Sequence, residues 1–360
     1  MARCPTCGAT YPDEARFCTR DGARLISSTP PIAPAVPTPR STAAVQRGDP
    51  PLPAVTHANL VGKTLQGRYQ IERKVGEGGM SFVYLATDVA TRERYAIKVL
   101  SAALSQDVNA MARLRREASL GMRLAHPNVC HIIRLGETED GLVYVVMPFV
   151  DGEILADRTN RLGQIPLADA VPLVRDIATG LNLAHELKIV HRDLKPENVM
   201  VCKRGDRDVA VVMDFGLAKE RKAGAELQKL TATGIILGTP EFMSPEQLRG
   251  KPLDPRTDIY SLALMTYEML TGKLPFAGRT QQELMIARLR SEPTPLRKMR
   301  PDVAFPEAVE AVLLKAMARN PDERYQNTIE FADAFAAAAA EGEKDTGHGG
   351  DGLLGKLFGR

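Results

Sequence analysis

A glycine-rich turn, GEGGMSFV from Gly76 to Val83, contains the first residues in the chain whose types suit the binding of an anion. It lies between two stretches that alternate like β-strands, and glycines there let backbone N–H groups approach phosphate oxygens without a Cβ in the way. No helix opens directly after the turn and no Gly-Lys-Ser/Thr triplet follows it, so dinucleotide-binding and Walker-type loops lack their required context. Taken alone, the turn is also compatible with a flexible hairpin.

A lysine follows in the middle of an apolar stretch, RYAIKVL, fifteen residues beyond Val83. An ammonium group is costly to bury there unpaired, so Lys98 needs an anionic partner. The next segment has apolar residues at helical spacing, and its sole carboxylate before Glu137 is Glu117. A Lys98–Glu117 pair would direct the ammonium toward the α- and β-phosphates of a nucleotide. A surface lysine and a solvated helix face are the alternatives.

An acid, a base and an amide are concentrated further along the chain, in VHRDLKPENVMV, which contains His191 to Val201. The ends of this segment are β-forming, so we expect its polar residues on a loop between short strands. Thirteen residues later, VVMDFGLA places Asp214 at the end of another apolar run. Any one of these residues alone would be interpreted as an ion-pair partner or a turn former.

Together, HRDxKxxN and DFG, preceded by GxGxxxxV and AIK, resemble the signature set of the protein kinases. The resemblance covers about Tyr69 to Phe335. GEGGMS, HPNV at His126 to Val129, HRDLKPEN and GTPEFMSPEQ make the chain most similar to the bacterial serine/threonine protein kinases of eukaryotic type.

The resemblance implies an α+β, bilobal fold. A small antiparallel β lobe with one helix would span about 65–147, and a larger, mainly helical lobe about 151–338. The strand patterns between Tyr69 and Leu100 agree with an antiparallel meander, and helical patterns dominate after Pro166. Residues 1–25 would form a zinc-ribbon-like module, 26–64 a flexible linker rich in Pro, Ala and Thr, and 339–360 a Gly-rich, disordered tail.

The resemblance also assigns catalytic roles and cofactors. Asp193 would accept or orient the proton of the substrate hydroxyl, Lys195 would neutralise the γ-phosphate in flight, and Asn198 and Asp214 would hold Mg²⁺, with Mn²⁺ as an alternative. A lysine two residues after Asp193 favours serine and threonine over tyrosine acceptors. A nucleotide-binding pseudokinase scaffold is the alternative function, but the presence of the whole set, Lys98 and Glu117 included, favours the enzyme.

For the ATP site, the resemblance places Met147 at the gatekeeper position and the hinge between the lobes at Pro148 to Val150. The carbonyl of Pro148 and the N–H of Val150 would bind adenine, although proline has no N–H to give. The full set of expected nucleotide contacts is Val75, Gly76, Glu77, Gly78, Gly79, Met80, Ser81, Val83, Ala96, Lys98, Met147, Pro148, Val150, Met200 and Met213.

A switch segment is expected between Asp214 and Glu246. Thr231 and Thr233 match the autophosphorylated threonines of the bacterial family, and a phosphate there could pair with Arg192 and order the loop. Thr239 would contact Asp193 and Lys195. The resemblance further implies a buried Glu246–Arg324 ion pair and an Asp258 that braces the catalytic loop.

The helix that carries Glu117 departs from the family pattern at Gly121, a position that is often bulkier and apolar. Glycine is about 1 kcal/mol worse than alanine in a helix. We therefore expect this helix to be loosely held until a partner or phosphorylation fixes it.

Composition limits the remaining function classes. In 360 residues, 47 Lys and Arg balance 44 Asp and Glu, so the formal charge of +3 indicates no dominant nucleic-acid partner. Five cysteines at irregular spacing do not form a disulfide framework, and neither a signal-peptide core nor a run of about 18 apolar residues occurs. We expect a soluble, cytoplasmic protein with protein substrates and, as an open question, a homodimer for trans-autophosphorylation.

The first cysteines suggest a separate module. CPTCG and CTRDG both have the form Cys-x-x-ligand-Gly, so Cys4, Cys7, Cys18 and Asp21 could close a tetrahedral zinc site. The alternative is three free thiols in a disordered arm. If zinc binds, we expect the module to recognise a partner protein.

Overall fold

The computed structural model describes residues 2–3, 10–11, 60–78, 81–101, 105, 108–215 and 240–347. The chain divides into two units, residues 1–55 and 56–360. In the first unit β1 (Ala2–Arg3) pairs antiparallel with β2 (Thr10–Tyr11). The predicted zinc ligands Cys4, Cys7, Cys18 and Asp21 lie outside the described residues, as do Thr231, Thr233 and Thr239.

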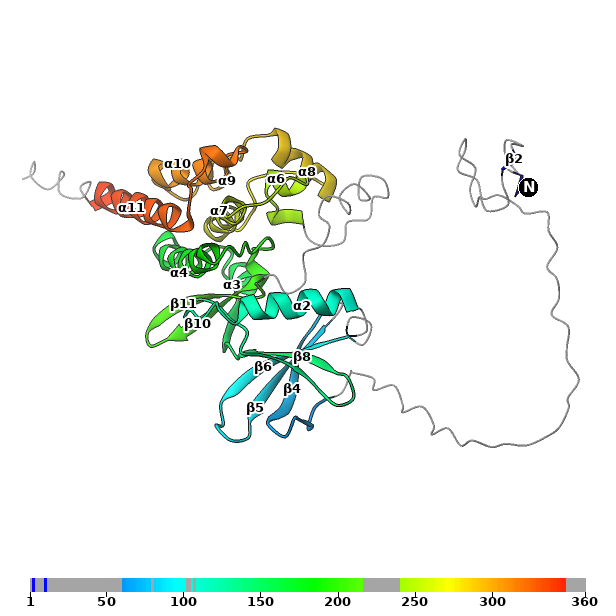
Figure 1. The fold of residues 1–360 in the computed structure, drawn as a ribbon. Helices are drawn as coiled ribbons and strands as arrows, with labels where there is room; N and C mark the ends of the chain where they lie inside the picture. The colour runs from blue at the N-terminus through cyan, green and yellow to red at the C-terminus, as the bar shows by residue number, and fades with distance from the viewer. Residues whose placement is uncertain are drawn as a thin grey trace, which may run out of the picture. The chain divides into compact units, whose positions relative to one another are not determined.

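The small lobe of the second unit is built on a six-stranded antiparallel sheet, which includes the meander predicted between Tyr69 and Leu100 (Figure 1). The strand order is β3-β4-β5-β6-β8-β7. The strands are β3 (Thr64–Leu65), β4 (Tyr69–Gly78), β5 (Ser81–Asp88), β6 (Arg94–Leu100), β7 (Arg134–Glu137) and β8 (Val143–Pro148). The lobe begins before residue 65, inside the stretch 26–64 expected to be a linker, because Leu60 is buried in its core and its carbonyl accepts the Lys63 N–H.

Alternation along these strands separates two faces. Tyr84, Ile97 and Val146 are register partners on one face of the sheet, where they pack in a hydrophobic cluster with Leu60 and Leu65. Val83, Lys98 and Val145 are partners on the opposite face, which also carries Ala96 and Met147. Strand pairing therefore brings Lys98 and the expected apolar nucleotide contacts to one surface.

Helix α2 (Val108–Gly121) packs on this lobe and ends at the unusual glycine. An ideal Cβ on Gly121 would lie 2.8 Å from the Cδ1 atom of Ile132, closer than real Cβ atoms approach. The absent side chain leaves no gap, because Ile132 fills the space. The expectation that Gly121 loosens the helix does not agree with this packing, since glycine here permits close contact.

The loop between α2 and β7 attaches the small lobe to the large one. The Cys130 N–H donates to the Val212 carbonyl at 2.8 Å, and the Val212 N–H donates to the Asn128 carbonyl at 2.9 Å. Helix α4 presses on the same loop at Gly180, where a Cβ would lie 2.8 Å from the Asn128 oxygen. The HPNV segment, residues 126–129, therefore links the two lobes, and the α4 residue that packs against it has to be glycine.

The large lobe contains most of the helices and a small sheet. The sheet has the order β11-β10-β9, with β9 (Gly152–Ile154), β10 (Val199–Arg204) and β11 (Arg207–Val212). The helices are α3 (Leu155–Leu162), α4 (Leu167–Glu186), α6 (Pro245–Leu248), α7 (Arg256–Thr271), α8 (Gln281–Arg290), α9 (Leu296–Met299), α10 (Glu307–Ala316) and α11 (Thr328–Gly347), with short 3-10 turns η1 (Pro196–Asn198), η2 (Pro240–Phe242) and η3 (Pro321–Glu323). In the described part of the chain, no helix combines the length and the apolar character needed to cross a membrane.

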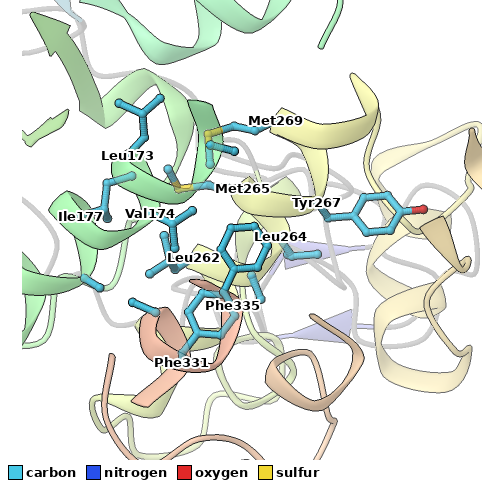
Figure 2. Close-up of a cluster of buried hydrophobic side chains, with 14 of the residues drawn as sticks. Leu173, Val174, Ile177, Leu262, Leu264, Met265, Tyr267, Met269, Phe331 and Phe335 are labelled. Atoms are coloured by element: carbon cyan, nitrogen blue, oxygen red, sulfur yellow. The ribbon is translucent and has the colours of Figure 1, made fainter. Parts of the chain in front are cut away.

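The core of this lobe forms where α4, α7 and α11 meet, as Figure 2 shows. Val174 and Ile177 of α4 lie against Leu262 and Met265 of α7, and Phe335 of α11 closes the cluster. All five side chains are fully buried. Helix α7 is buried around its whole circumference, so it is a rigid support for whatever its N-terminus holds.

Two further boundaries differ from the expectations. Helix α11 continues to Gly347, past the domain end expected at 338, because alanine, the best helix former, fills residues 336–340. Upstream of the loop of residues 191–198 there is a helix end where a strand was expected: Lys188 has a φ of +63°, and the Ile189 N–H donates to the Ala184 carbonyl to close α4. On the downstream side the predicted strand is present as β10.

We expect Gly121→Leu to destabilise the protein by about 1–3 kcal/mol, because the new side chain overpacks Ile132. The measurement is the free energy of urea unfolding for Gly121→Leu, Ile132→Ala and the double variant. Removing the Ile132 side chain makes room, so the double variant should be more stable than the sum of the single effects predicts. Strict additivity would show that the two positions are not in contact.

Candidate active site

The loop of residues 191–198 is held in place by a buried carboxylate, that of Asp258, near the start of α7. Its Oδ2 accepts the His191 N–H at 2.8 Å and lies 2.7 Å from His185 Nε2, while its Oδ1 accepts the Arg192 N–H at 3.0 Å. The residue is 0% exposed. The predicted bracing of the loop by Asp258 is confirmed.

Ionisation of Asp258 depends on these contacts. Burial opposes the charged form most strongly, but the hydrogen bond from His185, electrostatic interactions with His185 and His191 and the His191 N–H together hold the pKa of the carboxyl below its usual range. Asp258 is therefore an anion that can accept several hydrogen bonds at neutral pH. Its sequence position, 65 residues after Asp193, gives no sign of this contact without the family resemblance.

Arg192 has its backbone fixed at both ends and its side chain exposed. Its φ is +65°, which is unfavourable for a residue with a Cβ. Asp258 accepts its N–H, and Gln247 Nε2 donates to its carbonyl at 2.7 Å. Gln247 is itself positioned by a capping box with Ser244 at the start of α6. These contacts hold the strained backbone in place while the guanidinium extends into solvent.

Asp193, Lys195 and Asn198 come together in the next turn of the loop. Asn198 Nδ2 donates to the Asp193 carbonyl at 2.7 Å and to Asp193 Oδ2 at 3.2 Å. Lys195 Nζ lies 3.9 Å from the same Oδ2. The carboxylate thus has an amide donor on one side and an ammonium on the other, and it is 22% exposed.

A histidine connects this loop to the strand end that bears Asp214. His191 Nδ1 accepts the Asp193 N–H at 3.3 Å, so the ring proton belongs on Nε2, which donates to the Met213 carbonyl at 2.9 Å. The Met213 N–H donates to the Asn198 carbonyl at 2.8 Å, and the His191 ring meets Phe215 edge-on. Asp214, with a φ of +51°, follows directly and is turned toward the small lobe.

Lys98 has its observed ionic partner in the other lobe. Its Nζ lies 2.8 Å from Asp214 Oδ1, with side-chain exposures of 17% and 42%. The partner expected from the sequence, Glu117, has its backbone in α2, but its side chain lies outside the described side chains. Asp214 is 116 residues from Lys98, too far along the chain for the local sequence pattern to indicate the pair.

The expected apolar nucleotide contacts gather in one cluster, in which Val83, Ala96, Met147, Val150 and Met213 pack together. Val75 lies at a register irregularity of the β4–β5 pair and is 39% exposed, and Met200 is half-buried on β10. Gly76 to Gly78 pair with Val83 to Ser81, so the glycine-rich turn is a hairpin, while Gly79 and Met80 lie outside the described residues.

Some of the backbone groups in the expected hinge, Pro148 to Val150, already make hydrogen bonds within the protein. The carbonyl of Pro148 accepts a long contact from the Cys130 thiol, Sγ to O 3.6 Å, and the Phe149 N–H donates to the Arg94 carbonyl. In the described part of the chain the N–H of Val150 donates to no protein oxygen, so it is available to a ligand. Glu77 pairs with Lys74 at 2.6 Å.

Asn198 and Asp214 suit a magnesium ion. The amide nitrogen of Asn198 is committed to Asp193, which leaves its amide oxygen as the atom that can bind a cation. Asp214 gives one carboxylate oxygen to Lys98 and keeps the other. Carboxylate and amide oxygens are the protein ligands that Mg²⁺ prefers. No cluster of three or more His, Cys, Asp or Glu side chains that could hold a metal occurs among the residues that the structure describes.

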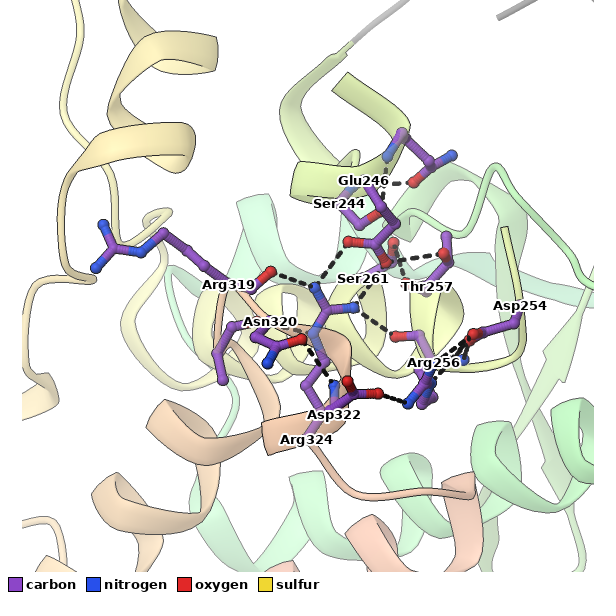
Figure 3. Close-up of polar contacts among 12 residues, drawn as sticks. Ser244, Glu246, Asp254, Arg256, Thr257, Ser261, Arg319, Asn320, Asp322 and Arg324 are labelled. Carbon is purple, nitrogen blue, oxygen red and sulfur yellow. Dashed lines mark hydrogen bonds and ion pairs between the residues drawn. The ribbon is translucent and has the colours of Figure 1, made fainter. Parts of the chain in front are cut away.

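The predicted Glu246–Arg324 ion pair is confirmed and lies beneath α6 (Figure 3). Arg324 donates to both carboxylate oxygens, at 2.7 and 2.8 Å, and Thr257 Oγ1 donates to Glu246 at 2.9 Å. Burial opposes the ionisation of Glu246, but Arg324 outweighs it and lowers the pKa of the carboxyl. Arg324 also donates to the carbonyls of Ala318 and Arg256, so each of its three guanidinium nitrogens makes a hydrogen bond.

One ionisable group near the loop of residues 191–198 was not predicted from the sequence. Burial, with smaller contributions from the charges of Glu197 and Glu241, raises the pKa of Glu268 on α7 to about 7. Glu197 belongs to the loop of residues 191–198 and Glu241 to η2. The three carboxylates come from segments up to 71 residues apart, so no local pattern could have predicted that they interact.

Comparison with known proteins agrees with this geometry. The family model described as "Protein kinase domain" matches residues 69–335. Serine/threonine-protein kinase PknB of Mycolicibacterium smegmatis is 39% identical over 74% of this chain and 42% of its own length, and pkn3 of Myxococcus xanthus is 36% identical over 79% and 52%. PrkC of Bacillus subtilis is 36% identical over 79% and 42%. The chain thus spans about half the length of these relatives, or less.

Solved structures show the same fold. The kinase domain of Mycobacterium tuberculosis PknI has a TM-score of 0.60 and 28% identity, covering 78% of this chain and all of that one. A structure of Rad53 residues 1–466 in complex with AMP-PNP also has a TM-score of 0.60, with 25% identity over 74% of this chain and 64% of that one. The protein-kinase fold expected from the sequence is confirmed for the two lobes.

We expect Glu268→Gln to change how stability depends on pH. Because the folded pKa is about 7 and the ordinary value is 4.5, the unfolded chain ionises first, and wild-type stability falls between these pH values. The glutamine variant lacks this loss, so its advantage should be near zero at pH 4.5 and grow to at most about 3 kcal/mol above pH 7. Urea unfolding from pH 5 to 8 measures it, with the exposed Glu139→Gln as control. An advantage that does not change with pH would contradict the raised pKa.

Proposed function

Because this chain belongs to the protein kinase family, we propose that it is a bacterial serine/threonine protein kinase of eukaryotic type, which transfers the γ-phosphate of ATP to serine and threonine hydroxyl groups of proteins. One observation carries the proposal. Lys98, Asp193, Lys195, Asn198 and Asp214, which come from both lobes, are held around one site by the contacts described above. The reaction class would be that of non-specific serine/threonine protein kinases, EC 2.7.11.1.

The protein contributes mainly position and charge to such a reaction. Asp193 Oδ2 would accept the proton of the substrate hydroxyl, and its orientation is fixed by Asn198. Lys195, on the other side of the carboxylate, would neutralise charge that develops on the transferred group. Lys98 would bind the non-transferred phosphates, with Asn198 and Asp214 as ligands of Mg²⁺. When bound, ATP and Mg²⁺ supply the phosphoryl group and a divalent positive charge.

The adenine would lie on the cluster formed by Val83, Ala96, Met147, Val150 and Met213, below Val75 and the hairpin turn, with Met200 from the large lobe on the opposite side. Support comes from the shared apolar surface and from the unoccupied N–H of Val150. The rest of the expected contact set, from Gly76 to Ser81, would cover the phosphates.

Regulation by autophosphorylation is part of the proposal. The Arg192 guanidinium is exposed beside Asp193 on a backbone that is fixed at both ends, which makes it a suitable partner for a phosphate. Thr231 and Thr233 are the proposed phosphate acceptors, and Thr239 the proposed contact to Asp193 and Lys195. A homodimer for phosphorylation in trans would be compatible with this scheme.

We expect the full chain with Mg²⁺ and radiolabelled ATP to label itself and a generic basic substrate, and mass spectrometry to find phosphate on Thr231 or Thr233. Lys98→Met should abolish transfer, and Asp193→Asn should lower it by roughly 10²–10⁴-fold, because the proton acceptor is lost. Nucleotide binding without transfer would identify the pseudokinase scaffold, the alternative function. Transfer without phosphate on either threonine would reject the switch alone.

For the N-terminal module we propose a structural zinc site formed by Cys4, Cys7, Cys18 and Asp21, which would recognise a partner protein. Metal analysis of the full chain, purified without chelators, should find one zinc ion per chain, and Cys7→Ser should lose it. Cys202→Ser is the matched control, because this cysteine lies in the kinase lobe. Zinc far below one equivalent in the unchanged protein would favour the alternative of three free thiols.

A further inference from the structure

A groove of about 740 Å³ lies on the large lobe between the end of α6, the end of α8 and the segment that leads into η3. Its lining includes Glu246, Arg249, Asp254, Arg290 and Asp322. It is separate from the nucleotide site, but α6 connects the two. Gln247 of α6 binds the Arg192 carbonyl, and its neighbour Glu246 already belongs to the groove.

Each carboxylate that lines this groove already has an arginine partner. Glu246 pairs with Arg324 at 2.7 Å, and Arg256 pairs with both Asp254 and Asp322 at 2.7 Å (Figure 3). Each carboxylate therefore has an arginine contact, and because Arg256 serves two of them, one negative charge is left over from these pairs.

Three cations at the edge of the groove have no such partner. Arg249, Lys251 and Arg290 are exposed, and among the described residues no carboxylate lies within ion-pair distance of any of them. Within the described part of the chain, their side chains make one polar contact, from Arg249 Nη2 to the Leu289 carbonyl at 3.5 Å. These three cations outnumber the one negative charge left over from the pairs, so the groove carries a net positive charge on a chain whose overall charge is only +3.

Local structure explains how these cations converge. Gly250 has a φ of +64°, its N–H donates to the Gln247 carbonyl, and the Lys251 N–H donates to the Glu246 carbonyl, which is a Schellman ending of α6. Arg290 is the last residue of α8. Cations are favoured at helix C-termini, which accounts for each one separately. It does not account for three of them facing one hollow whose acids are already paired.

We propose that this groove is a docking site for an acidic, Asp- or Glu-rich segment of the protein substrate. Carboxylates would supply the charge that the lining lacks, and guanidinium groups bind them in bidentate fashion. The position suits a substrate, because a protein whose acceptor residue reaches Asp193 passes α6. The assignment to a substrate rests on the proposed kinase function, whereas the binding of an acidic segment does not.

The test is fluorescence anisotropy with the full chain and a labelled peptide of alternating Glu and Ser, compared with the same peptide containing Gln for Glu. The acidic peptide should bind more tightly, and its affinity should fall as salt rises. In Lys251→Glu/Arg290→Glu its Kd should increase at least about tenfold. Lys273→Glu/Lys298→Glu makes the same charge change at exposed lysines outside the groove and should alter the Kd less than about twofold.

Arg249 is left unchanged because its contact with Leu289 contributes to packing. Equal binding of the Glu and Gln peptides, or an equal loss in both double variants, would overturn the proposal. A single-stranded DNA of the same charge that binds more tightly than the peptide, and shows the same loss in the groove variant, would also overturn it.

Catalysis provides a second readout. For an acceptor peptide with and without an acidic tail, the ratio of the two KM values should favour the tailed peptide in the wild type and approach one in Lys251→Glu/Arg290→Glu. An unchanged ratio would show that substrates do not dock in the groove. Failure of transfer to the untailed peptide by the wild type would instead reject the proposed kinase function and leave the binding result standing.

Discussion

The buried carboxylate of Asp258 is the interaction on which the site depends. It is the point where the apolar core of the large lobe, through α7, meets the backbone of the loop that carries Asp193. Two of its hydrogen-bond donors are the main-chain N–H groups of His191 and Arg192. Asp258 therefore fixes the backbone conformation of the loop, and not only the position of a side chain. A conformation with Arg192 at positive φ is unfavourable by itself, and it persists because the surrounding contacts over-determine it.

A second layer of contacts extends from this point. Gln247 fixes the carbonyl of Arg192, the capping box fixes Gln247, and the Glu246–Arg324 pair anchors α6 to the rest of the lobe. A buried pair like this is costly if either partner is removed, because the other charge is then left without compensation. The helix of four residues thus owes its position to polar contacts at both ends, more than to its own length.

Much of the fold was predictable because its signals are local. Two such signals are the strand alternation from Tyr69 to Leu100 and the spacing of HRDxKxxN before DFG. Both can be recognised without knowing how the rest of the chain is arranged. The family resemblance predicted one distant ion pair, Glu246–Arg324. Other distant contacts could not be predicted: Lys98 with Asp214, Glu268 near Glu197, and Ile132 in the space beside Gly121. Each joins residues whose proximity arises only after the lobes and helices have packed, so sequence periodicity carries no trace of it.

The two lobes are joined at neighbouring points, the hinge at Pro148 and the loop at Cys130, whose Sγ and O atoms are 3.6 Å apart. Adjacent joints act as a pivot, and the β5–β6 pair is a lever that extends from it. Tyr95 pairs with Pro148 next to the pivot, Lys98 is three residues farther out, and Ser81 at the tip pairs with Leu100, five residues out. At about 3.4 Å per residue these points lie roughly 10 and 17 Å from the pivot, so a rotation of about 10° moves them by roughly 2 and 3 Å. Small angular changes at the hinge therefore reach the glycine-rich turn as displacements comparable to the length of a hydrogen bond.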